Sequence, residues 1–508
     1  MHRIRFKTSG KNDILCSAEP NKTLLAAAQE AGVVINAPCG GKGTCGKCLV
    51  RIESELKNGS FKACETSVDC EITVYLDHSN LKNTLLEDAG IITTKNLSEY
   101  AKFAMAFDIG TTTIVGYLID MRMGEIFYTT SILNPQISFG ADVITRLNYA
   151  KENGGDKLTE LLRSAINSMI EEAVAHTLIN INQIQLVCVV GNTCMHHFFH
   201  GISTDSLCQA PFSATITEAL VNRAVDCGIR IRPEGIVKAL PNIGSFVGAD
   251  TVSALLACEL HETRDNFLLI DIGTNGELVM GSKGRMLACS AAAGPAFEGA
   301  KIDCGMRGEK GAIDHAVWED GRLKVSVIGD GKPVGICGSG VVDVIACLTK
   351  EGIIDETGLI TVPEVFDGKK VYIIVSGQES GIGAPIYLSQ QDVREVQLAK
   401  GAIAAAIIMM SNELALEISH IETVYLAGAF GNYMDAENAC RIGMILPALK
   451  DKIINIGNAA GEGARRAAID PNEYARAIAL AKKVEFIELA NNIAFQNCFC
   501  EQMGFEQE

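Results

Sequence analysis

Four cysteines near the amino terminus are the residues of this sequence best suited to chemistry. Cys39, Cys45 and Cys48 lie on a glycine-rich stretch in C-x5-C-x2-C spacing, and Cys64 follows on the next segment. Thiolates are soft, charged donors that bind iron, and a C-x4-C-x2-C…C spacing is known from [2Fe–2S] sites. The glycines let backbone amides turn toward inorganic sulfur, where side chains would crowd the cluster. We therefore expect these four cysteines to ligate a [2Fe–2S] cluster.

Other uses of the cysteines are a zinc site or reduced structural thiols. Zinc usually joins two short C-x2–4-C units, and this stretch has one. Cys70 rivals Cys64 as the fourth ligand, since both precede a predicted strand at 71–75. We favour Cys64 because it lies in a turn-like context, and we expect Cys16 to lie in the core.

The elements around these cysteines indicate a small domain of their own. Alternating residues predict strands at 3–8 and 13–16, and Asn21 or Thr23 caps a predicted helix that ends at Gly32. The order strand, strand, helix, cysteine loop and closing strand is that of a ferredoxin-like β-grasp domain. We assign it to residues 1–77 and read the polar, charged residues 78–102 as a linker.

Two stretches far apart in the chain repeat one pattern, FDIGTTT at 107–113 and IDIGTNG at 270–276. Each is a buried strand that ends in Asp, followed by a tight Gly-Thr turn and a returning strand. A Gly in the turn admits phosphate oxygens, Thr hydroxyls and amides donate to them, and Asp108 and Asp271 can hold Mg²⁺ through water. The repeat predicts two lobes of similar fold that bind a nucleoside triphosphate. The candidate phosphate contacts are Gly110, Thr111, Thr112, Thr113, Gly273, Thr274 and Asn275.

A third segment, TVYLAGAFGN at 423–432, is a predicted strand that runs into a G-x-x-G turn with Gly428 and Gly431. Alone, it could be an ordinary strand–helix turn. Together the three segments resemble the phosphate-1, phosphate-2 and adenosine motifs of the acetate and sugar kinase, Hsp70 and actin (ASKHA) superfamily. The resemblance implies an α+β multidomain chain with a two-lobed α/β ATPase, lobe I at 103–260 and lobe II at 261–508. It also implies ATP phosphates between the two hairpins and adenosine against the glycine turn.

Three further segments each allow two interpretations. Asn192 follows an apolar strand, so we favour a position at a cleft over an ordinary structural role. Gly338 and Ser339 lie in a glycine-rich turn before an apolar helix, suited to a phosphate contact or to close packing. Asp250 could position water for attack on a γ-phosphate, or it could be a routine helix cap.

Two other groups of potential metal ligands are not expected to bind a metal ion or an additional cluster. Adjacent histidines on a helix point in different directions, so for His196, His197 and His200 we favour surface or core contacts over metal binding. Cys498 and Cys500 provide two thiolates, too few for a [4Fe–4S] cluster.

Composition excludes several classes of function. A chain of 508 residues can form two to four domains, and its net charge of −17 argues against nucleic acid as a partner. The longest apolar run, residues 401–410, is too short to span a bilayer and predicts a buried helix. Because 18 cysteines occur without a secretory signal, we expect a reducing, cytoplasmic environment and no membrane partner.

With both halves interpreted, the whole chain resembles the reductive activators of corrinoid proteins, which join an N-terminal [2Fe–2S] domain to this type of ATPase. The likeness extends through 190–197, 244–250, 291–299, 302–307 and 335–340. It implies ATP-dependent reduction of Co(II) to Co(I) in a corrinoid protein of a methyltransferase or O-demethylase-type system. It further implies an upstream electron donor and a homodimer through the second lobe. Larger members carry a separate middle domain, which residues 78–102 are too few to form.

We expect ATP to act by changing how the chain docks on its corrinoid partner, so that cobalt loses or exchanges an axial ligand and accepts an electron. Two alternatives are a small-molecule kinase with a fused redox sensor and an ATP-switched regulatory protein. The kinase predicts a phosphorylated product, and the regulator predicts that substitutions of the cluster ligands leave function intact.

Overall fold

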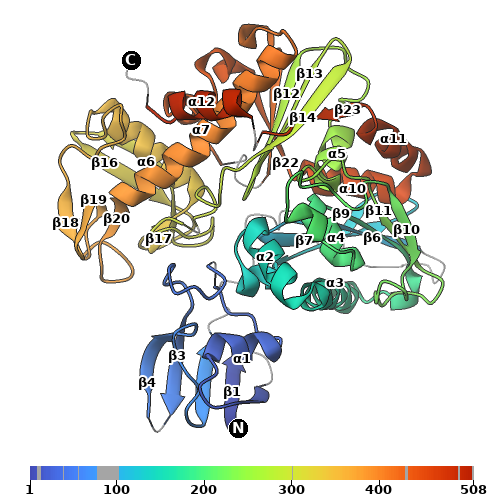
Figure 1. Ribbon diagram of the computed structural model, residues 1–508, viewed down its shortest axis with the longest axis horizontal. Helices are drawn as coiled ribbons and strands as arrows, with labels where there is room; N and C mark the ends of the chain where they lie inside the picture. The colour runs from blue at the N-terminus through green and yellow to red at the C-terminus, as the bar shows by residue number, and fades with distance from the viewer. Residues whose placement is uncertain are drawn as a thin grey trace. The chain divides into compact units, whose positions relative to one another are not determined.

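The computed structural model describes residues 1–8, 13–37, 39–54, 56–76, 102–299, 301–428, 433–489 and 492–505 (Figure 1). Its contacts divide the chain into two compact units, the first running mainly from the amino terminus to Ala239 and the second from Leu240 to the carboxyl terminus. The predicted linker lies outside the described residues except for Lys102. The lobe boundary that we placed at 260 stays a proposal.

The amino-terminal domain is a five-stranded sheet in the order β2-β1-β5-β3-β4 with one helix. Strand β1 pairs antiparallel with β2 and parallel with β5, as a β-grasp requires. Thr23 caps the helix, since its Oγ1 accepts a hydrogen bond from Ala26 N at 3.2 Å. The predicted strands and helix are confirmed. The elements are β1 (His2–Thr8), β2 (Ile14–Ala18), α1 (Leu24–Glu30), β3 (Leu49–Ser54), β4 (Asn58–Lys62) and β5 (Ile72–Leu76).

The rest of the first unit is built on a six-stranded sheet in the order β10-β11-β9-β6-β7-β8. The elements are β6 (Phe103–Ile109), β7 (Thr113–Asp120), β8 (Ile126–Leu133), η3 (Pro135–Phe139), α2 (Val143–Asn153), α3 (Asp156–Thr177), η4 (Ile181–Gln183), β9 (Ile184–Gly191), α4 (Thr193–His200), η5 (Asp205–Leu207), β10 (Leu220–Arg223) and β11 (Ile236–Ala239).

The second unit contains another six-stranded sheet, in the order β22-β21-β12-β13-β14-β23, and two three-stranded sheets, β16-β15-β17 and β18-β19-β20. Its strands are β12 (Phe267–Ile272), β13 (Gly276–Ser282), β14 (Arg285–Ala291), β15 (Ala312–Glu319), β16 (Arg322–Val327), β17 (Gly335–Ile336), β18 (Glu364–Phe366), β19 (Lys369–Val375), β20 (Ile386–Ser389), β21 (Thr423–Ala427), β22 (Ile453–Gly457) and β23 (Val484–Phe486). Its helices are α5 (Ala249–Ala257), α6 (Gly338–Lys350), α7 (Gln390–Glu413), η6 (Ile418–His420), α9 (Ala436–Arg441), η7 (Pro447–Lys452), α10 (Ala459–Ile469), α11 (Pro471–Ala481) and α12 (Ile493–Glu501).

The two six-stranded sheets share one topology over five of their six strands, which confirms the predicted duplication. In the first, β6 pairs antiparallel with β7 and parallel with β9. In the second, β12 pairs antiparallel with β13 and parallel with β21. Strands β11 and β22 extend the sheets in parallel, and β8 and β14 extend them antiparallel on the other side. Each Asp-Gly-Thr motif therefore joins the equivalent pair of strands.

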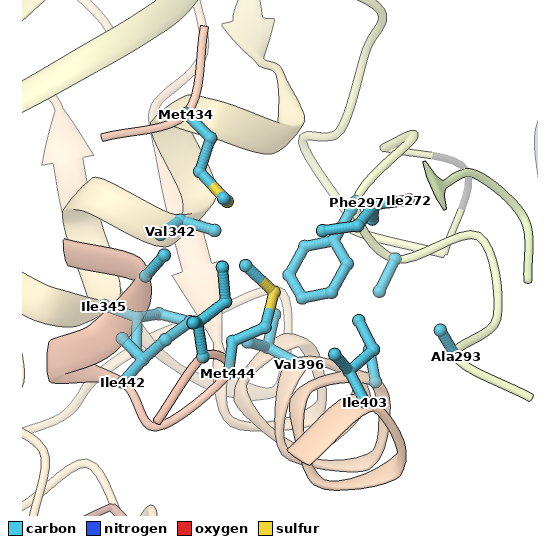
Figure 2. Close-up of a cluster of buried hydrophobic side chains, with 14 of the residues drawn as sticks. Ile272, Ala293, Phe297, Val342, Ile345, Val396, Ile403, Met434, Ile442 and Met444 are labelled. Carbon is cyan, nitrogen blue, oxygen red and sulfur yellow. The ribbon is translucent and has the colours of Figure 1, made fainter. Parts of the chain in front are cut away.

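The core of the second unit fixes the direction of the side chains on β12. Ile270 and Ile272 are buried in a large apolar cluster that also contains residues of α6 and α7. Figure 2 shows Ile272 and Phe297 in this cluster with Val342 of α6 and Ile403 of α7. Because successive residues of a strand point to opposite faces, Asp271 lies on the face away from this cluster.

The predicted buried helix at 401–410 is part of α7, whose residues Ala402 to Ile407 are almost completely buried. Among the residues described, no helix combines the length and the apolar character needed to cross a membrane.

Helix α5 is held by an unusually close approach to α10. A Cβ atom on Gly463 would lie 2.0 Å from the Ser253 carbonyl oxygen, and Ser253 Oγ donates to the Ala460 carbonyl oxygen at 2.5 Å. Only a residue without a side chain permits this crossing. The contact sets the position of α5, which carries Asp250 in its first turn.

We expect Gly463→Ala to destabilise the second unit by about 1–3 kcal/mol, since the methyl group must displace backbone rather than a flexible side chain. Chemical denaturation measures the change. Gly155→Ala is the control, because a Cβ there meets nothing within 4 Å at an ordinary φ of −86°. Equal stability of the two variants would contradict the close crossing.

Two histidines of α4, His196 and His197, are buried in the first unit, and His200 is half-buried at the end of the helix. His197 is satisfied: its Nδ1 lies 2.7 Å from the Thr193 carbonyl oxygen, and its Nε2 accepts from Thr215 N at 3.1 Å. Within the described chain, neither ring nitrogen of His196 has a hydrogen-bond partner. Burial, followed by the charges of neighbouring histidines, lowers the pKa of His196, and burial followed by Arg163 and His197 lowers the pKa of His200 to about 4. His196 and His197 are thus core residues, one of the two kinds of contact that we favoured.

These histidines predict acid lability. Below about pH 6.5 they protonate in the unfolded chain but stay neutral in the folded one, so stability falls as the pH decreases toward about 4. His200 alone accounts for roughly 3 kcal/mol of this loss. Thermal unfolding between pH 7.5 and 5 should show a smaller decrease for His196→Phe than for the wild type. Exposed His176→Gln is the control, and a His196→Phe profile that parallels the wild type would contradict the assignment.

Candidate functional site

The four predicted cluster ligands form two thiol pairs in the amino-terminal domain. Cys45 Sγ lies 3.3 Å from Cys39 Sγ, and Cys48 Sγ lies 3.2 Å from Cys64 Sγ. The charge on Cys39 also acts on Cys64, so the two pairs are neighbours. Two adjacent pairs suit a cluster of two irons in which each iron takes two thiolates. One zinc ion would instead draw all four sulfurs to a single centre.

The loop that carries three of these cysteines depends on glycine. A Cβ on Gly43, at φ +75°, would lie 3.0 Å from Glu65 Oε1 beside the Cys64 segment. A left-handed backbone is open to glycine at little cost, so the sequence can bring amides close to sulfur. The glycines of this loop with positive φ are Gly40, Gly41, Gly43 and Gly46.

Electrostatics distinguish the thiols. Burial raises the pKa of Cys39, but hydrogen bonds from Cys45 and Thr44 outweigh it and lower that pKa to about 6. Burial, followed by the Cys48 thiol, raises the pKa of Cys64 to about 11. Cys70 packs at the edge of the domain core. The structure thus brings Cys64 to Cys48, as we favoured, and ligation itself stays a prediction.

In the first hairpin, the loop between β6 and β7 turns its carbonyl groups inward. Gly110 O accepts from Asn134 Nδ2 at 2.8 Å, Thr111 O from Arg146 at 2.6 Å, and Thr112 O from Asn134 N at 2.8 Å. Asn192, the N-cap of α4, donates from Nδ2 to Thr111 Oγ1 at 2.9 Å. In a trans peptide the N–H points opposite the carbonyl. The amides of residues 111–113 therefore point away from these partners, an arrangement suited to an anion.

The hairpin of the second unit is lined by carboxylates. Asp271 lies directly across from Glu277 in the β12–β13 ladder, and the charges of Asp250 and Asp271 both act on Glu277. Thr274 Oγ1 donates to Glu298 at 3.0 Å, and the charge of Glu298 acts on Asp271. Each of Asp250, Asp271 and Glu277 keeps a small exposed fraction. These residues are accessible from outside the unit.

Burial and like charge disfavour ionisation of this cluster. Burial, followed by Asp271, raises the pKa of Asp250 to about 7. Burial, followed by Glu298, raises that of Asp271 to about 6. Burial, followed by Asp250 and Asp271, raises that of Glu277 well above its usual range. A divalent cation would relieve the repulsion, and Mg²⁺ does so while keeping several waters.

Within the described residues, no group of three or more His, Cys, Asp or Glu side chains is arranged to hold a metal ion directly. Water-mediated contact is the mode that we expected for Asp108 and Asp271. Asp108 lies at the end of β6, opposite Val115 of β7 and Val190 of β9.

The remaining predicted contacts differ in their surroundings. Gly428 follows β21 at φ +89°, and a Cβ there would lie 2.8 Å from Asp271 Oδ1. Gly431 lies outside the described residues. Ser339 Oγ donates to the Asp314 carbonyl oxygen at 2.9 Å, and a Cβ on Gly340 would lie 2.3 Å from Ile313 O. Close packing thus accounts for this turn, and nucleotide contact by Gly338 and Ser339 stays a prediction.

Three residues of the candidate site were not predicted from the sequence: Arg146, Glu277 and Glu298. Arg146 shares the buried face of α2 with Val143 and Ala150, so a charged residue at apolar helical spacing was the available signal. Glu277 was readable as an acidic residue two positions beyond the Gly-Thr-Asn turn. Glu298 lies in one of the segments of the family likeness, 291–299, which gave it no individual role.

Comparison with known families covers almost the whole chain. Residues 7–69 match the 2Fe–2S iron–sulfur cluster binding domain, residues 103–263 the RACo middle region, and residues 265–508 the C-terminal domain of RACo, the ASKHA domain. The RACo middle region matches the residues that we predicted to form the first lobe, and it lies outside residues 78–102, which we expected to be too few to form a separate domain.

Similar proteins have related names. The chain is 31% identical to the corrinoid activation enzyme RamQ of Eubacterium limosum, over 91% of this chain and 93% of that one. It is 27% identical to the [Co(II) methylated amine-specific corrinoid protein] reductase of Methanosarcina barkeri, over 79% and 77% of the two chains. A solved structure of a reductive activator for corrinoid, iron–sulfur protein aligns with a TM-score of 0.74 and 26% identity, over 99% and 98%. With an iron–sulfur domain, a RACo middle region and an ASKHA domain in this order, the chain belongs to the family of reductive activators of corrinoid proteins.

Proposed function

We propose that this protein is an ATP-hydrolysing activase that reduces a corrinoid protein, delivering one electron to convert inactive Co(II) to Co(I) in a methyltransferase or O-demethylase-type system. The observation that carries the proposal is the pairing of Cys39 with Cys45 and of Cys48 with Cys64, in a chain whose relatives are named for corrinoid activation. A [2Fe–2S] cluster held by these thiolates supplies one-electron chemistry.

The residues of the chain have separable roles in this proposal. Hydrogen bonds to Cys39 favour its thiolate, the form that binds iron. The amides of residues 111–113 receive phosphate oxygens of ATP, and Asp108 and Asp271 hold the waters of Mg²⁺. The Gly273–Asn275 turn and Gly428 complete the nucleotide contacts. Asp250, whose pKa of about 7 suits proton transfer near neutral pH, orients the hydrolytic water.

ATP must bind more tightly to the transfer-competent complex than to the resting one, since a ligand shifts an equilibrium only by its difference in affinity. Binding then changes how the chain docks on the corrinoid protein, and the partner's cobalt loses or exchanges an axial ligand. Hydrolysis and product release reset the complex.

Several finer features belong to the same proposal. The domains are 1–77, a linker at 78–102, lobe I at 103–260 and lobe II at 261–508. The protein acts in the cytoplasm, takes electrons from an upstream donor and forms a homodimer through the second lobe.

The cluster assignment predicts different outcomes for neighbouring cysteines. Cys64→Ala should lose most of its iron and the visible absorption of a [2Fe–2S] cluster, since Cys48 loses its partner 3.2 Å away. Cys70→Ala is the matched control and should keep both. Iron analysis and absorption spectra of anaerobically purified protein measure the effect, and the reverse result would make Cys70 the fourth ligand.

Coupling to ATP is tested with reduced protein and a Co(II) corrinoid partner. The visible spectrum should show Co(I) with Mg·ATP and much less without it. Asp271→Asn should lower the ATP-dependent rate by about a hundredfold or more, because its charge beside the cation is lost, while the cluster spectrum is unchanged. Equal Co(I) yield with and without Mg·ATP would refute the coupling. A phosphorylated product in proportion to ATP consumed would favour the kinase alternative.

A further inference from the structure

A fully buried arginine, Arg146, lies behind the loop to which we assign phosphate binding. Its guanidinium donates to the Thr111 carbonyl oxygen at 2.6 Å, to the Gly140 carbonyl oxygen at 2.9 Å and to Gln136 Oε1 at 3.0 Å. A buried charge is costly unless its donors are paired. The guanidinium of an arginine presents its donors in a rigid, spread fork, whereas the three donors of a lysine lie on one compact ammonium.

Contacts outside the phosphate loop set the position of Arg146. Asp142 caps α2, since its Oδ1 accepts from Thr145 N at 2.7 Å. The backbone at Gly140 passes so close to α2 that a Cβ would lie 2.5 Å from Thr145 Cγ2. One turn into the helix, Arg146 replaces an apolar residue on the buried face. Its position therefore follows from the cap and the glycine rather than from a ligand.

Thr111 is held on two sides. Arg146 binds its carbonyl oxygen, and Asn192 binds its hydroxyl at 2.9 Å. Arg146 also contacts Met195 Sδ at 3.7 Å, on the helix that Asn192 caps. The loop is thus clamped between the starts of α2 and α4. A rotation of the Thr111–Thr112 peptide would break the charge-assisted bond to Arg146 and turn the carbonyl oxygen outward.

We propose that Arg146 is a positioning residue for phosphate binding: it holds the Thr111 carbonyl inward, so that the amide on the opposite side of that peptide faces the nucleotide phosphates. The inference rests on the proposed ATP site. An outward carbonyl would present negative partial charge to an anion, whereas an outward amide presents a donor. Arg146 then controls affinity for phosphate but not for the nucleoside.

The test compares affinities of ATP and adenosine for the full chain by equilibrium binding. Arg146→Lys keeps the charge but loses the fork. Its ATP affinity should fall about tenfold to a hundredfold, the size of a lost charge-assisted hydrogen bond, with adenosine affinity within about twofold of the wild type. Arg163→Lys is the matched control, since Arg163 also donates to a backbone carbonyl, that of Phe199 at 2.9 Å.

A second variant keeps the proposal testable if Arg146→Lys does not fold, as judged by circular dichroism and the cluster spectrum. Gln136→Leu removes an acceptor to which Arg146 donates at 3.0 Å without adding a charge, and it should show the same selective loss. Equal losses for ATP and adenosine, or none in a folded variant, would overturn the inference while leaving the ATP site in place. A wild type that binds no ATP would refute the proposed function and this inference with it.

Discussion

The pairing of one central strand with two unlike neighbours is the constraint on which each half of the nucleotide-binding part depends. Strand β6 runs antiparallel to β7 and parallel to β9, and β12 repeats this with β13 and β21. The antiparallel partner returns through a tight loop, and the parallel partner ends at the same edge. In the first half, loop amides, a strand-end carboxylate and the Asn192 cap of the helix after β9 therefore meet at one edge without a long connection, and in the second half a hairpin loop and a strand-end carboxylate do so.

The features that could be predicted from the sequence were those formed by residues close together in the chain. The two hairpins, the cap at Thr23 and the cysteine loop each lie within about twenty residues, so their spacing alone indicated their geometry. Asn192 was placed at the end of its strand for the same reason. The contact of Asn192 with Thr111 joins residues 81 positions apart, and a single sequence carries no signal for it.

The residues that sequence reasoning missed act through burial. Glu277 belongs to the carboxylate cluster because it lies opposite Asp271 in the ladder, where like charges are unfavourable. Arg146 can hold the loop because its side chain is fully buried, which strengthens each of its hydrogen bonds. Both depend on the dielectric of the assembled unit, which composition and periodicity do not reveal. Gly428 was found by its turn, whereas its approach to Asp271 needed the register of β21.

The thiol pairs of the amino-terminal domain have a consequence for handling this protein. Sulfurs 3.2 and 3.3 Å apart need only a small movement to reach the S–S bond length of about 2.05 Å. In air, two disulfides and one iron–sulfur cluster therefore compete for the same four thiolates. A chain with both disulfides formed could not bind iron until a reductant cleaved them. The fraction of molecules that carry a cluster therefore depends on earlier exposure to oxygen as well as on folding.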